Sequence, residues 1–176
     1  MPKVILARAS YEYRELSECF FNLMDRLGGD SIGKGCRVLI KPNLLSPAPP
    51  AKAILTHPLI IRAAAEYVLE KGGIPQVSDS QAIGSFRRVL KEGGISEALQ
   101  GLPVVFREFS ESEVVETGPP FHRVEIASDA LHADVVINLP KLKSHTQMFL
   151  TLGVKNLFGC IVGMRKPEWH FRTGVD

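Results

Sequence analysis

The chain has few cysteines, and none of them forms a recognisable metal or cluster motif. Cys19, Cys36 and Cys160 lie far apart among 176 residues, and no CxxC pair occurs. A zinc ribbon or a ferredoxin-type iron–sulfur cluster needs closely spaced cysteines, so this chain alone can build neither. A sparse, odd set of cysteines is typical of a reducing compartment, which predicts a cytoplasmic location.

Long apolar runs and strong charge are also absent. No segment approaches the roughly 18 apolar residues that indicate a membrane span, and the N-terminal apolar stretch is too short for a signal peptide. The formal net charge is +2, which does not by itself favour nucleic acid. With 45% hydrophobic and 23% charged residues, the composition predicts one globular domain over residues 1–176, with neither a nucleic-acid nor a membrane partner.

Strand-like and helix-like segments alternate along the chain. Apolar residues recur every three or four positions from Leu16 to Leu27, which predicts an amphipathic helix. Thr56 is expected to cap a second helix at 57–71. The remaining expected elements are strands at 3–9, 36–40, 74–79, 102–109, 121–127 and 133–139, short helices at 85–94 and 95–101, and a largely helical segment at 146–163.

This alternation predicts an α/β fold with an open, mostly parallel sheet and helices on both faces, in Rossmann-like layers. Four of the strands have near-continuous apolar runs, which are typical of strands buried on both faces. We therefore expect the strands near 4–8, 37–41, 75–79 and 134–138 to be adjacent and central.

The segment "GGDSIGKG" (28–35) has the glycine and lysine spacing of a phosphate-binding P-loop. Gly35 stands where that loop needs Ser or Thr, so the magnesium-binding hydroxyl is missing. A P-loop also runs from a strand into a helix, whereas this segment leaves a helix and enters a strand. Lys34 is therefore interpreted as a solvated turn residue.

Polar and titratable residues follow three of the predicted strands. Ligands of open α/β sheets bind outside the carboxyl ends of the strands, so these residues are expected to share one cleft. They are Lys41 and Asn43 after "CRVLI" (36–40), Asp79, Ser80 and Ser85 after "PQV" (75–77), and Asn138, Lys141, Lys143 and His145 after "DVVI" (134–137).

The residue types indicate chemistry on an anion. Lysines around a concave site attract anions, and partial desolvation lets a lysine act as a base or nucleophile. Lys143, His145 and Asp79 are the predicted catalytic residues, with His145 as the acid/base and Asp79 as its carboxylate counterpart. The predicted ligand-binding residues are Lys41, Asn43, His57, Ser80, Ser85, Asn138, Lys141, Lys155 and Asn156; no metal ligand is predicted.

Most of these residues also have an ordinary structural interpretation. Asp79 and Ser80 are residue types that cap helices, and His145 could equally be a neighbour of a cap. Lysines are mostly exposed, so Lys141 and Lys143 could be solvated loop charges. Lys41 could end its strand with its stem on the apolar surface and its ammonium in water.

Several segments resemble the domain of unknown function 362 family. They are "LIKPNLL" (39–45), "THP" (56–58), "VSDS" (77–80) and, as the most specific part, "NLPKLKSHTQMFLTLGVKNLFGCIVGMRKPEWH" (138–170). The resemblance implies that these segments belong together in space. Many members carry a ferredoxin-like segment with two four-iron four-sulfur clusters. This chain lacks the cysteines for it, so the resemblance implies no known cofactor here.

Members of that family usually continue with further α/β structure, so the resemblance implies an N-terminal fragment or a short form. Two function classes follow from the sequence. In the first, the chain binds or transforms an anionic small molecule. In the second, a basic loop edge docks an acidic ferredoxin-like partner without catalysis. A deep pocket that contains Lys143, His145 and Asp79 would favour the first class, and a flat basic rim the second.

Overall fold

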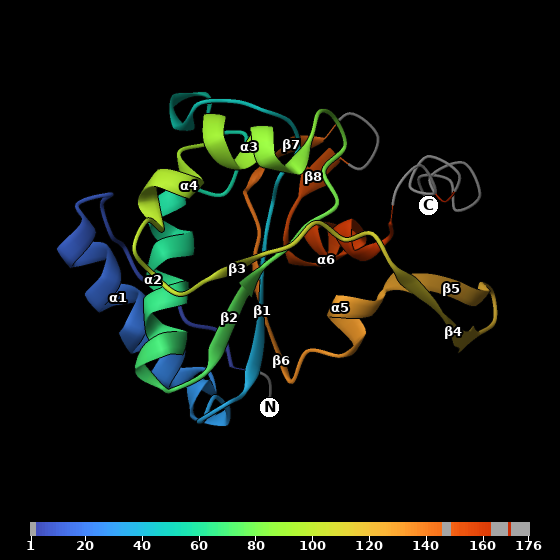
Figure 1. Ribbon diagram of the computed structural model, residues 1–176, viewed down its shortest axis with the longest axis horizontal. Helices are drawn as coiled ribbons and strands as arrows, with labels where there is room; N and C mark the ends of the chain where they lie inside the picture. The colour runs from blue at the N-terminus through green and yellow to red at the C-terminus, as the bar shows by residue number, and fades with distance from the viewer. Residues whose placement is uncertain (1–2, 146–148, 163–168, 170–176) are drawn as a thin grey trace.

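The computed structural model describes residues 3–145, 149–162 and 169. Its four-stranded sheet has the order β3-β2-β1-β6, and every neighbouring pair is parallel (Figure 1). The strands are β1 (Arg37–Pro42), β2 (Ile74–Val77), β3 (Val105–Phe106) and β6 (Val135–Leu139). The α/β fold expected from the sequence is confirmed.

Helices lie on both sides of this sheet (Figure 1). On one side are α1 (Tyr13–Arg26), α2 (Pro58–Glu70), α3 (Phe86–Glu92) and α4 (Ile95–Ala98). On the other side are α5 (Ser128–Leu131) and α6 (Gly153–Leu157). Successive side chains of β1 alternate between the two sides, because Val38 and Ile40 pack in the larger core whereas Leu39 packs with Phe109 and Cys160.

Two antiparallel hairpins extend from the layered core. One joins β4 (Ser112–Gly118) to β5 (His122–Ala127), and the other joins β7 (Lys143–His145) to β8 (Phe149–Thr151). Single turns of 3-10 helix occur at Gly29–Ser31, Pro50–Lys52 and Phe158–Cys160. The second hairpin begins four residues after β6, so it is anchored at the carboxyl end of the parallel sheet.

The prediction of a strand at residues 3–9 is wrong. The other three strands expected to be central are adjacent, because β1 pairs with β2 on one edge and with β6 on the other. Residues 3–9 have no strand structure, and Val4 and Leu6 are 91% and 97% exposed. An apolar run becomes a strand only when another strand supplies hydrogen-bond partners, and among the described residues none lies against this one. Its only described side-chain bond joins Lys3 Nζ to the carbonyl of Arg26.

Other boundaries differ from the expectation. The segment predicted as largely helical contains β8 and only five residues of α6, while 146–148 and 163 lie outside the described residues. The strand expected at 102–109 is reduced to Val105–Phe106, and β4 was not predicted. The cap of α2 is His57, whose Nδ1 accepts from the N–H of Leu59, and not Thr56.

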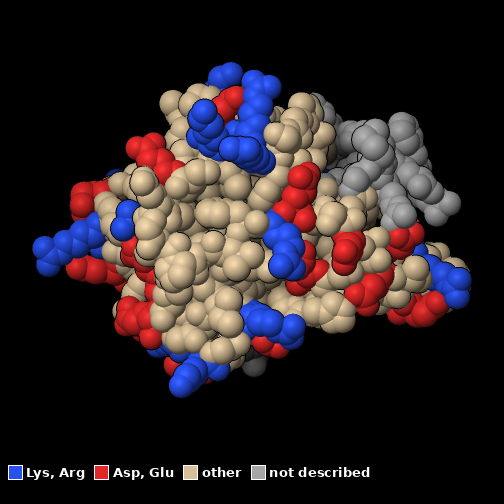
Figure 2. All heavy atoms as spheres, in the orientation of Figure 1, with Lys and Arg blue, Asp and Glu red and all other residues tan. Residues whose placement is uncertain are grey.

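Charge is distributed unevenly around the molecule. Figure 2 shows basic side chains gathered at the top, over α3, where Arg87, Arg88 and Lys91 are exposed. This is the end of the sheet to which the parallel strands run (Figure 1). Lys34 is exposed in the turn before β1, at the opposite end. Among the described residues, no helix is long and apolar enough to cross a membrane.

Candidate functional site

The candidate site lies where the strand order reverses. Within the sheet, β2 and β3 follow one another outward from one edge of β1. The chain then returns and adds β6 along the opposite edge of β1. The segments that leave β1 and β6 therefore diverge and leave room between their carboxyl ends, which is where open α/β sheets bind ligands. Lys41 is paired with Asn138 in the register, and Pro42 with Leu139.

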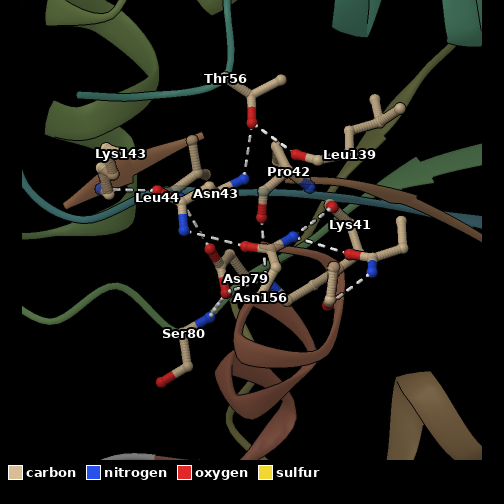
Figure 3. A network of polar contacts seen from close by, with 12 residues as sticks. Lys41, Pro42, Asn43, Leu44, Thr56, Asp79, Ser80, Leu139, Lys143 and Asn156 are labelled. Atoms are coloured by element: carbon tan, nitrogen blue, oxygen red, sulfur yellow. Dashed lines mark hydrogen bonds and ion pairs between the residues drawn. The ribbon is translucent and has the colours of Figure 1, made fainter. Parts of the chain in front are cut away.

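A buried ion pair forms the floor of this site (Figure 3). Lys41 is 0% exposed and Asp79 is 3% exposed, and Lys41 Nζ lies 2.7 Å from Asp79 Oδ1. The carboxylate also accepts the N–H groups of Leu44 and Ser80, at 2.9 and 2.8 Å. With three donors on its two oxygens, the Asp79 charge is well compensated, as a buried carboxylate requires. The pair joins the ends of β1 and β2.

A chain of asparagine side chains runs over the ion pair. Asn156 is buried, its Oδ1 accepts from Asn43 Nδ2 at 2.9 Å, and its Nδ2 donates to Asn138 Oδ1 at 2.8 Å. Asn156 Nδ2 also lies 3.2 Å from the carbonyl of Lys41. Asn138 in turn donates to the carbonyl of Gly153. These bonds fix α6 against the carboxyl ends of β1 and β6.

Thr56 and Lys143 hold the other side of the site (Figure 3). The Thr56 hydroxyl accepts from the N–H of Asn43 at 2.8 Å and donates to the carbonyl of Leu139 at 2.6 Å, so it links the two diverging strands. Lys143 Nζ donates to Asn43 Oδ1 and to the carbonyl of Ile54, at 2.8 and 2.7 Å. An ammonium has three donors, so one N–H of Lys143 is not used by the described residues.

A small cavity of about 90 Å³ opens beside this network. Its volume limits the group that it can hold to a few non-hydrogen atoms. Leu44, Leu45 and Phe158 contribute apolar wall. The polar lining consists of Lys41, Asn43, Asp79, Ser80, Lys155 and Asn156.

The lysines of the site influence one another. Burial is the main cause that lowers the pKa of Lys143; Asp79 opposes this shift, and Lys141 and Lys155 add to it. Burial also lowers the pKa of Lys155, and the charge of Lys41 lowers it further. Both shifts mean that the folded protein disfavours the ammonium form, which a bound anion would favour again.

Two histidines stand at the edge of the lysine cluster. Burial lowers the pKa of His145, and the charges of Lys155 and Lys143 lower it further. Burial and Lys141 lower the pKa of His57, which stacks on Tyr11 with 3.8 Å between ring centroids. Both imidazoles are therefore mainly neutral at pH 7 and gain charge only in more acidic solution.

Most of the residues predicted for the site lie close together. Eight of them share the network or line the cavity directly. Lys141 and Lys143 lower the pKa values of His57 and His145, respectively, so these residues lie at the edge of the group. Ser85 does not line the cavity, and its hydroxyl instead accepts from the N–H of Arg88 as the cap of α3. Among the described residues, no three His, Cys, Asp or Glu side chains are grouped so that they could hold a metal ion.

Sequence reasoning missed two groups that shape the site. One is Gly159, where an added Cβ would lie 2.5 Å from Asp79 Oδ1 and 2.7 Å from Lys41 Nζ. The other is Thr56, which the sequence suggested only as a helix cap. The sequence around Gly159 does not indicate that this glycine lies against the ion pair. For Thr56 a signal was present, because "THP" at the end of a long loop marked this region as part of the site.

Comparison with known proteins gives a family but no reaction. The sequence profile of "Domain of unknown function (DUF362)" matches residues 38–175. Thylakoid-associated protein sll1697 of Synechocystis sp. is 41% identical over 174 residues, which cover 98% of this chain and 54% of that protein. The chain thus spans about half the length of this relative. No solved structure matches. With most of its length inside the profile, the chain belongs to the DUF362 family.

Proposed function

We propose that the chain binds a small anion in the cavity at the carboxyl ends of β1 and β6. The observation that carries this proposal is the balance of charge in the site. Four lysines, Lys41, Lys141, Lys143 and Lys155, are grouped with one described carboxylate, and Asp79 already accepts three hydrogen bonds. An incoming anion would therefore meet cations that the described residues do not neutralise, in a partly desolvated place where such contacts are strong.

The predicted roles of individual residues are part of this proposal. Lys155, which lines the cavity, would contact the anion, and Lys143, which is bonded to the cavity residue Asn43, would attract it. His145 would transfer a proton if the bound molecule is also transformed. Asp79 would act mainly by holding Lys41, because its oxygens are occupied. We also propose that the protein is cytoplasmic, as its sparse cysteines predict. The name of the Synechocystis relative associates that protein with thylakoids, and cell fractionation would test the location of this one.

Replacing Lys143 by alanine is expected to weaken anion binding by at least tenfold, because a partly desolvated charge beside the cavity contributes about 2–3 kcal/mol. Inorganic phosphate, oxalate and pyruvate are suitable probes, with binding measured by calorimetry over a series of salt concentrations. Lys34→Ala is the matched control, since it removes the same charge from an exposed turn at the opposite end of the sheet. Both variants need the same unfolding midpoint as the parent protein.

Equal losses from Lys143→Ala and Lys34→Ala would contradict a defined anion site. They would favour the second candidate function, the docking of an acidic protein partner such as a ferredoxin-like domain. A specific observation supports that candidate. Phe149 and Val154 are 81% and 88% exposed beside the lysines, and Leu142 is exposed as well. Exposed apolar side chains bordered by charge are typical of protein contacts.

Anion affinity is expected to rise by about two- to fivefold as the pH falls from about 7.5 to about 5.5. The pKa of His145 lies below its ordinary value, so the imidazole is neutral at pH 7 and becomes a cation beside the anion in acid. The lowered pKa of His145 also affects stability. Without ligand, the folded protein loses stability as the pH falls below about 6.5, because His145 binds a proton more readily in the unfolded state.

Calorimetric titrations at both pH values test this expectation. His145→Gln should remove part of the rise, and His57→Gln another part, because burial and Lys141 lower the pKa of His57 as well. An affinity that falls on acidification, or a rise that neither variant reduces, would contradict the proposed position of the anion.

A further inference from the structure

Lys155 differs from the other lysines that contact the asparagine network or the cavity. Lys41 and Lys143 are fixed by oxygen acceptors, as described above. Among the residues that the structure describes, Lys155 has no hydrogen-bond acceptor, and its ammonium lies 4.5 Å from the centroid of the Phe158 ring. The side chain is half-buried and lines the cavity. Lys155 is therefore the lysine whose charged form receives the least support from oxygen atoms.

The surroundings of Lys155 favour its neutral amine form. Burial is the main cause that lowers the pKa of this lysine, and the nearby charge of Lys41 is the second. Asp79 does not compensate, because its Oδ1 is occupied by Lys41 and the N–H of Ser80. A lysine that is desolvated beside another cation is the type that reacts with carbonyl groups.

We propose that Lys155 forms an imine with the carbonyl group of a small 2-oxo acid bound in the cavity. This inference rests on the anion site proposed above and names its substrate class. The carboxylate of a 2-oxo acid supplies the negative charge that the lysine cluster attracts. Its carbonyl carbon is the next atom along, so both groups fit within a cavity of about 90 Å³.

The chemical step is balanced without a further reactant. The lone pair of the Lys155 amine attacks the carbonyl carbon, and the carbon–oxygen π electrons move to the oxygen, which takes a proton. After the nitrogen gives up a proton, the carbon–oxygen single bond breaks with a second proton, water leaves, and the nitrogen lone pair completes the carbon–nitrogen double bond. The product is a protonated imine and one water, with one proton taken from solvent overall.

The test is reductive trapping. The protein is incubated with pyruvate and sodium borohydride, which delivers a hydride to the imine carbon and leaves a stable secondary amine. Intact mass and peptide mapping then locate the adduct. We expect one adduct per chain on Lys155 and at least about a tenfold loss of labelling in Lys155→Arg, which keeps the charge and removes the nucleophile. Lys34→Arg is the matched control and should label as the parent does.

Three outcomes would overturn the inference. Labelling spread over exposed lysines, or labelling undiminished in Lys155→Arg, would show ordinary surface reactivity. Absence of any adduct would also overturn it. Calorimetric binding of phosphate and of propionate, which lacks the carbonyl, separates this failure from failure of the anion site. If these anions bind while pyruvate is not trapped, the anion site stands and the imine is rejected; if none binds, both proposals fail.

Discussion

Lys41→Met is expected to lower the free energy of unfolding by about 3–5 kcal/mol, because it leaves Asp79 buried without its cation. Lys41 is 0% exposed and Asp79 is 3% exposed, so the carboxylate recovers little solvation without local opening. Asp79→Asn should be costly for the same reason, since the Lys41 ammonium is then unpaired. The measurement is urea unfolding followed by circular dichroism, at a pH near 7.

The double variant Lys41→Met/Asp79→Asn decides the cause of the loss. It removes both charges and keeps an amide oxygen that can accept a backbone N–H near Leu44 or Ser80. We expect it to be more stable than the sum of the single losses predicts, with a coupling of at least about 1 kcal/mol. If the losses in the free energy of unfolding are strictly additive, the ion pair is not the cause of the destabilisation. Glu18→Ala, which breaks an exposed pair with Arg14, should have little effect.

Gly159→Ala is expected to destabilise the protein by about 1–3 kcal/mol and to weaken anion binding. The added Cβ would lie 2.5 Å from Asp79 Oδ1 and 2.8 Å from Lys41 Cε, and neither atom has free space to move away, because both belong to the buried pair. Gly159 also lines the cavity, so the methyl group reduces the space for a ligand.

Gly33→Ala is the control for this substitution, because nothing lies within 4 Å of its added Cβ and its backbone does not require glycine. Thermal unfolding and phosphate titration of the two variants provide the comparison. Equal unfolding midpoints for Gly159→Ala and Gly33→Ala would show that the backbone over the ion pair moves aside easily. The described packing of Gly159 would then not limit the site.

The sequence was most informative where periodicity and burial coincide. The three- and four-residue spacing in α1, and the apolar runs of β1, β2 and β6, predicted these elements well. Residues 3–9 have the same apolar character, but no strand in the described part of the chain pairs with them. Strand pairing is a property of two segments that a single run does not reveal. The antiparallel pairing of β7 with β8 was not predicted, because the sequence between these strands contains no glycine or proline to mark a hairpin.

The grouping of the candidate site residues could be predicted from their positions in the fold, but their hydrogen-bond and ion-pair partners could not. Residues that follow strands of a parallel sheet meet at one edge, which is why Lys41, Asp79 and Lys143 could be grouped in advance. The sequence could not assign partners within that group. Lys41 and Lys143 are the same residue type, yet one is locked in a buried pair and the other reaches Asn43 and Ile54. Such differences arise from distances of a few ångströms between residues that are 38 to 100 positions apart in the sequence.

The attachment of α6 has a consequence for motion. Asn156 is the one buried residue of this five-residue helix, and Val154 is 88% exposed, so the helix is held by amide hydrogen bonds with little apolar packing. Elements with so few apolar contacts open at much lower free energy than the core around them. Hydrogen exchange at residues 153–157 should therefore be faster than in β1. A transient departure of α6 would expose Lys41 and Asp79 while the parallel sheet stays folded, so access to the floor of the site would be gated by this short helix.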